Sequence, residues 1–201
     1  DETGYAVVKQ LHGYLFVTDF GGLKGGYDDD TLAALARIAR DQKVNKVLIE
    51  ANFGDGMFTK LFLPVLSRYW ECGVEETKHS TQKELRIIDT LEPVMNRHKL
   101  VIDYGAIKKD IFENQDEPAY SLCYQLTRIT RDRGSLRHDD RLDALAMGVG
   151  YWVNAMSRDA ERALQEYRDE RREAEFKVFM DHVIGKPSPR SDIRRRFTRS
   201  F

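Results

Sequence analysis

Four acidic side chains from two distant parts of the sequence have types and spacings that could do chemistry together: Glu50, Asp139, Asp140 and Asp143. Glu50 closes the apolar run 46–50, which is typical of a buried parallel strand. Because ligand crevices in open α/β sheets lie at the carboxyl ends of strands, Glu50 is well placed for a metal or a substrate. Taken alone, Glu50 could equally well be an ordinary residue, the first exposed one after the strand.

The three aspartates lie within the stretch HDDRLDALA, residues 138–146. At about 100° per helical residue, Asp139 and Asp143 lie about 40° apart around the helix, and Asp140 and Asp143 about 60° apart. Like charges so close repel unless a cation neutralises them. The helix macrodipole accounts for an anion at the helix start, such as Asp139, but poorly for Asp143, which borders the apolar stripe. The spacing therefore favours a metal-binding role.

Phosphodiester hydrolysis is a reaction that uses such a set of acids. Two hard cations about 3.5–4 Å apart can activate a water and stabilise the leaving oxygen. Magnesium prefers oxygen ligands and accepts one or two carboxylates together with phosphate oxygens and waters. His138 could assist proton transfer or bind metal, and a capping or packing role is an equally good interpretation of a lone histidine.

The elements that must position these acids begin with a hairpin, in which His12-Gly13 makes the turn. The glycine-rich stretch 21–26 lacks the ending of a nucleotide-binding loop and is predicted to be a flexible connection. The predicted elements are strands 3–11 and 14–20, helix 30–42 (capped by Asp30 or Asp28), strand 46–50, helix 57–72, strand 74–78, a helix from the capping stretch 80–84 to about 97, strand 100–103, helix 121–130 and a helix from 138. This order fits an α/β protein with a mixed sheet flanked by helices, and several such folds share it.

The last predicted helix changes character along its length. Its first part has an apolar stripe that includes Leu142, Leu145 and Val149, whereas the sequence after Ser157 is almost wholly charged and predicts an exposed helical extension. We predict a main domain at 1–157, the charged helical extension at 158–184 and a basic, flexible C-terminal tail at 185–201.

Composition limits the class of protein. Of the 201 residues, 41% are hydrophobic and 32% charged, and no apolar run approaches the roughly 20 residues that cross a bilayer, which predicts a cytosolic protein without membrane contact. The start of the chain lacks signal-peptide features, and Cys72 and Cys123 are predicted to be buried thiols. The net charge of −1 argues weakly against nucleic acid. This net charge does not exclude DNA as a partner, because a metal-dependent enzyme must carry acids. In addition, residues 186–201 hold six basic residues against one acid.

Three segments together resemble the C-terminal nuclease of large terminase subunits of tailed phages, most closely the short-tailed podovirus type. They are VLIEANFGDGMF at 47–58, HSTQKELRIIDTLEPVMNRHKLVID at 79–103 and RHDDRLDALA at 137–146, and the similarity runs in order from residue 3 to about 156. The resemblance implies an RNase H-like fold and an endonuclease that uses two divalent metals, Mg²⁺ or Mn²⁺, to cut concatemeric double-stranded viral DNA during packaging. By position, Glu50 matches the strand-end acid of the family and Asp140, with Asp139, the helix acids. Asp143 is the next candidate, and Asp55 and His138 are auxiliary candidates.

The same resemblance implies features that this sequence does not carry. Such nucleases have a further catalytic aspartate on a first strand ahead of the hairpin, and the sequence starts too late to include it. Asp1 would lie in the connecting loop and is not a candidate. The implied partners are the ATPase domain of the same subunit, the procapsid portal and the small terminase subunit, and the implied place of action is the host cytoplasm at the portal.

Basic side chains near the acids are candidates for DNA contacts: Lys83, Arg86, Arg131, Arg133 and Arg137. For each of these residues taken singly, a solvated surface side chain is the better interpretation than a DNA contact. Arg131, Arg133 and Arg137 have the best claim to a DNA contact, because their loop leads directly into the acid cluster. Two alternatives to a packaging nuclease remain. One is another RNase H-like DNA enzyme of the resolvase or transposase type, and the other is a non-catalytic module that grips DNA or docks on the portal.

Overall fold

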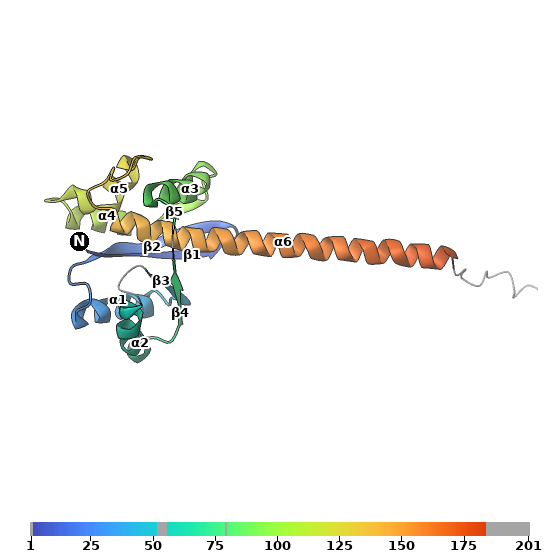
Figure 1. Cartoon of the computed structure of the whole chain (residues 1–201), viewed down its shortest axis with the longest axis horizontal. Helices are drawn as coiled ribbons and strands as arrows, with labels where there is room; N and C mark the ends of the chain where they lie inside the picture. Colours follow the sequence, from blue (N-terminus) through green and yellow to red (C-terminus); the bar gives the residue numbers. More distant parts are fainter. Residues whose placement is uncertain (1, 52–55, 79, 184–201) are drawn as a thin grey trace, which may run out of the picture. The chain divides into compact units, whose positions relative to one another are not determined.

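The computed structural model describes residues 2–51, 56–78 and 80–183 (Figure 1). The chain divides into two compact units, Asp1–Asn154 and Ala155–Phe201. All five strands of the described residues lie in the first unit, and the described part of the second unit is helical. The assignment of 158–184 and 185–201 to an extension and a tail stays a prediction, and residues 184–201 lie outside the described part of the chain.

The predicted hairpin is confirmed. Strand β1 (Thr3–Leu11) pairs antiparallel with β2 (Tyr14–Leu23), and His12 and Gly13 form the turn with φ values of 50° and 78°, the left-handed pair that a tight hairpin favours. The prediction of a flexible connection is wrong for residues 21–23, because they pair with residues 3–5 and extend β2. Their glycines fit this place, since a Cβ on Gly22 would collide with the Glu2 carboxylate.

Two sheets make up the framework of the described residues. Strand β5 (Leu100–Ile102) runs parallel to β2 and completes a mixed three-stranded sheet in the order β1-β2-β5. Strand β3 (Lys46–Glu50) pairs in parallel with β4 (Gly73–Thr77) in a separate two-stranded sheet. The parallel strand that was predicted to end in Glu50 is therefore confirmed.

Helices α1 (Asp29–Asp41) and α2 (Met57–Tyr69) pack with β3 around one apolar core. Its buried members are Leu32, Ala36, Ala39, Ile49, Phe58, Phe62 and Leu66. Asp28, one of the two predicted caps, accepts a 2.7 Å hydrogen bond from the Thr31 amide. Pro64 is accommodated inside α2, which ends at Tyr69, three residues before the predicted end of this helix.

The remaining helices are α3 (Lys83–Asn96), α4 (Tyr104–Glu113), the short 3₁₀ helix η1 (Pro118–Tyr120), α5 (Leu122–Arg128) and α6 (Asp140–Val183). Helix α4 is absent from the elements predicted from the sequence, although Asp103 caps its first turn by accepting from the Ala106 amide at 2.9 Å. Helix α6 continues to Val183, the last residue that the structure describes. No helix in the ranges that the structure describes is long and apolar enough to cross a membrane. Cys72 and Cys123 carry free, partly buried thiols, and burial raises the pKa of each.

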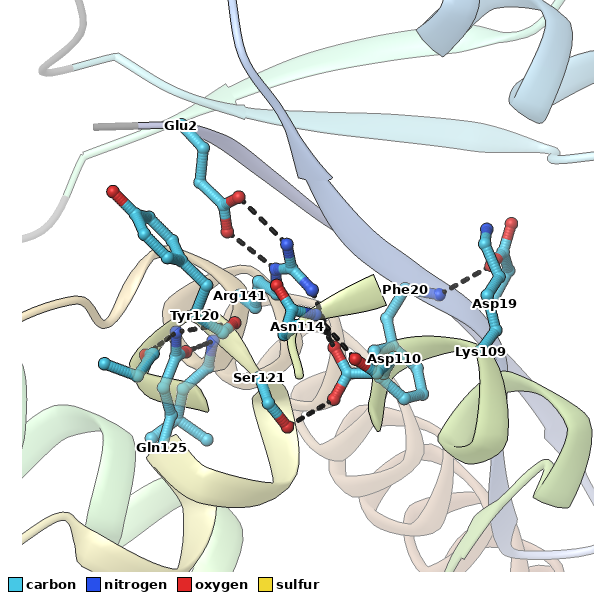
Figure 2. A network of polar contacts seen from close by, with 12 residues as sticks. Glu2, Asp19, Phe20, Lys109, Asp110, Asn114, Tyr120, Ser121, Gln125 and Arg141 are labelled. Carbon is cyan, nitrogen blue, oxygen red and sulfur yellow. Dashed lines mark hydrogen bonds and ion pairs between the residues drawn. The ribbon is translucent and has the colours of Figure 1, made fainter. Parts of the chain in front are cut away.

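A buried ion network fixes the first turn of α6 (Figure 2). The Arg141 guanidinium donates to both carboxylate oxygens of Glu2, at 2.6 and 2.9 Å, and to Asp110 of α4 at 2.7 Å. Asp110 also accepts from Ser121 at 2.7 Å, and Gln125 of α5 accepts from the Leu142 amide at 3.0 Å. The network thus ties α6 to the residue before β1, to α4 and to α5.

We predict that Arg141→Met lowers the free energy of unfolding by about 3–5 kcal/mol, because it leaves the buried carboxylates of Glu2 and Asp110 without a cation. Urea denaturation followed by circular dichroism measures the loss. The matched control is Arg171→Met, since the Arg171–Glu175 pair is exposed and contributes little. Equal stability of the two variants would contradict the structural role of the network.

Candidate active site

The acid at the end of β3 lies close to the acids of α6. Arg86 of α3 connects them, because its Nη2 atom lies 2.7 Å from Asp143 Oδ1 and 4.0 Å from Glu50 Oε1. The Asp143 side chain is 10% exposed and that of Glu50 36% exposed, so the group is reachable from solvent on the Glu50 side. Two carboxylates far apart in the sequence therefore share one guanidinium group.

A second cation bridges the acids within the α6 region. Lys83 Nζ lies 2.7 Å from Asp139 Oδ1 and 3.2 Å from Asp143 Oδ2. The pKa of Lys83 is raised: burial alone would lower it, but the hydrogen bond to Asp139 and the charges of Asp143 and Asp139 outweigh the burial. Asp143 is thus the centre of the cluster, with one oxygen held by Arg86 and the other by Lys83.

Asp140 is the first residue of α6 and lines the same cavity as Glu50, Lys83 and Asp143. Burial raises its pKa, Lys83 opposes the rise, and the negative charges of Asp139 and Glu2 add to it. The backbone of Asp140 lies against β1 at Gly4, where an added Cβ would collide with the Asp140 carbonyl oxygen. A glycine at this position lets the strand pass directly beside the first turn of α6.

The basic residues predicted to contact DNA fall into two groups. Lys83 and Arg86 are engaged by the acid cluster, whereas the side chains of Arg131, Arg133 and Arg137 are exposed on the loop between α5 and α6. Arg131 pairs with Asp89 at 3.3 Å and with Glu92 at 3.5 Å, both on α3. The same loop is fastened to α3 by a 2.6 Å hydrogen bond from the Gly134 amide to Glu84.

Of the auxiliary candidates, His138 packs against an aromatic ring. Its imidazole stacks on Tyr120, with ring centroids 3.9 Å apart, and its buried Nδ1 atom has no hydrogen-bond partner among the described residues. Asp55 lies outside the described residues. The structure therefore brings together Glu50, Asp139, Asp140 and Asp143 and shows a packing contact for His138.

The kind of ligand in the cluster suits a hard divalent cation, since Mg²⁺ and Mn²⁺ prefer carboxylate oxygens. Within the described parts of the chain, no three His, Cys, Asp or Glu side chains are grouped closely enough to hold a metal ion as they stand. Oxygens of Glu50, Asp139 and Asp143 instead face the nitrogens of Lys83 and Arg86. The residue types fit the metal, and the two basic side chains occupy the positions beside those three acids.

Sequence reasoning missed the part that Lys83 and Arg86 play. Their i, i+3 spacing places both on one face of α3, and that is the signal that could have indicated a shared partner. It also missed Arg141 as the centre of the buried network, although an arginine amid three aspartates in DDRLD is a sign of ion pairing.

Comparisons with known proteins agree with the fold. Residues 1–100 match the family model of the ribonuclease H-like domain of the bacteriophage T7 terminase. The large terminase subunit of Enterobacteria phage T3 is 44% identical over 189 residues, which are 92% of this chain and 32% of that protein. The chain thus spans about a third of the length of this relative. The α/β structure with a mixed sheet is accordingly RNase H-like, and the chain belongs to the nuclease-domain family of the large terminase subunits of podoviruses.

Proposed function

We propose that this domain is a metal-dependent endonuclease that cleaves concatemeric double-stranded viral DNA during genome packaging. The observation that carries the proposal is the meeting of Glu50 with Asp143 at the Arg86 guanidinium, and of Asp143 with Asp139 at the Lys83 ammonium. Family membership supports a nuclease role, and the cleavage itself is our inference from the acid cluster.

The acids take different roles in this proposal. Glu50, Asp139 and Asp140 would hold two Mg²⁺ or Mn²⁺ ions, which when bound activate a water and stabilise the leaving oxygen of the phosphodiester. Among the acids that pair with Lys83 and Arg86, Asp143 has the least exposed side chain, and it positions both basic groups around the site. His138 and Asp55 remain auxiliary candidates, for a proton-transfer or ligand role.

We place the further aspartate that the family resemblance implies in a cavity beside the acids. Its volume is about 680 Å³, and residues 2–10 along β1 and 41–50 around β3 line it together with Lys83, Asp140 and Asp143. Among the strands that the structure describes, β1 lies at an edge of the three-stranded sheet and β3 at an edge of the two-stranded sheet. We propose that a strand carrying the aspartate pairs with both edges, joins the two sheets and brings its acid to the cluster.

The DNA would approach along the loop between α5 and α6. Arg133 and Arg137 are exposed on that loop, which leads directly into the acids of α6, and arginine is well suited to phosphate oxygens. The further partners that we propose are the ATPase domain of the same subunit, the procapsid portal and the small terminase subunit. The proposed place of action is the host cytoplasm at the portal.

We predict that plasmid nicking in the presence of Mn²⁺ falls by at least about 100-fold in Glu50→Ala and in Asp140→Ala, because each variant loses a carboxylate of the site. The matched control is Glu75→Gln on the neighbouring strand β4, whose side chain is half exposed and pairs with Lys46. Gel electrophoresis of supercoiled plasmid measures the rate. Unchanged cutting in both alanine variants would refute the site, and the absence of cutting in every protein would favour the DNA-gripping or docking module.

We also predict that Arg137→Gln weakens binding to duplex DNA about equally for all sequences and lowers the slope of log K against log salt by about 1, because one phosphate contact is lost. Fluorescence anisotropy at several salt concentrations measures both quantities. Lys60→Gln on the exposed face of α2 is the control and should leave the slope unchanged. A slope equal to that of the unmodified protein would place the DNA elsewhere.

A further inference from the structure

Lys83 and Arg86 contact three of the four acids, and the two side chains differ in how firmly they are held. Both Arg86 and its partner Asp143 are nearly buried, at 12% and 10% exposure. Lys83 is 37% exposed, and its Asp139 partner 27%. Arginine forms a rigid planar fork, whereas lysine carries a compact charge on a flexible stem. Arg86 is therefore the fixed cation of the cluster, and Lys83 is the one that can swing away.

The Lys83 ammonium and a metal ion require the same positions on the acids. An ammonium that donates to Asp139 at 2.7 Å and to Asp143 at 3.2 Å already supplies the positive charge that the converging carboxylates need. A divalent cation binds carboxylate oxygens at about 2.0–2.1 Å, so placing it on Asp139 would bring two positive charges into direct repulsion with little water between them.

We infer that Lys83 is a built-in competitor for the metal: it occupies the acid cluster in the metal-free protein and must withdraw before Asp139 can take up Mg²⁺ or Mn²⁺. This inference rests on the proposed function, because it assumes that the acids bind metal. It goes further in assigning to one residue of α3 the regulation of metal loading. Lys83 then sets the metal concentration at which the site fills, while Arg86 keeps Asp143 neutralised throughout.

The test is the affinity for Mn²⁺, measured by isothermal titration calorimetry without DNA. Lys83→Met removes the charge and keeps a side chain of similar length, so Mn²⁺ should bind about tenfold more tightly than to the unmodified protein. Lys83→Arg keeps the charge and should bind Mn²⁺ as weakly as the unmodified protein. Arg97→Met changes an exposed cation beyond the last turn of the same helix and should have no effect.

Thermal unfolding provides a second readout that also reports whether each variant folds. Without metal, Lys83→Met should melt at a lower temperature than the unmodified protein, because its acids repel one another. Saturating Mn²⁺ should then raise the melting temperature of Lys83→Met by more than it raises that of the unmodified protein. Equal or weaker Mn²⁺ binding by Lys83→Met would overturn the inference and leave the proposed nuclease intact. The absence of Mn²⁺ binding by both proteins would overturn the inference and the proposed function together.

Discussion

Repulsion between carboxylates is the constraint on which the first unit depends. Four acids from β3 and from the start of α6 lie in one partly buried place, and such a group is stable only if positive charge neutralises it. In this structure the charge comes from one face of α3, through Lys83 and Arg86. The position of α3 beside α6 is therefore a requirement of the site as well as a feature of packing.

The framework around the site holds the acids in place although they repel. Arg141 follows directly after Asp140, and its buried pairs with Glu2 and Asp110 fasten the first turn of α6. Trp152, further along the helix, donates a 2.9 Å hydrogen bond to the Val8 carbonyl of β1. The helix therefore contacts β1 at two places, at Val8 and at Gly4 beside Asp140. A rigid support of this kind is what a metal site needs, since ligands that shift lose geometry and affinity.

Much of this arrangement could be predicted from the sequence because it depends on local patterns. The hairpin, the strand ending in Glu50 and the helix carrying Asp140 and Asp143 each have a clear periodicity or turn signal, and the family resemblance joined them into an RNase H-like fold. Helix α4 and the pairing of residues 21–23 with β1 were missed, since weak periodicity and glycines hide them until tertiary contacts are known. The contacts of Lys83 and Arg86 were missed for a different reason, because ion pairs between distant segments leave no local pattern. A solvated lysine and one bound to two acids look alike in a sequence.

We propose that Glu50 and the α6 acids form one metal centre in this RNase H-like domain. Anomalous diffraction from crystals soaked in Mn²⁺ locates the ions themselves, without reference to activity. We expect anomalous peaks bounded by Glu50 on one side and by Asp139 and Asp140 on the other. Crystals with Mn²⁺ peaks only at other acids, or with Glu50 turned away from every ion, would contradict it.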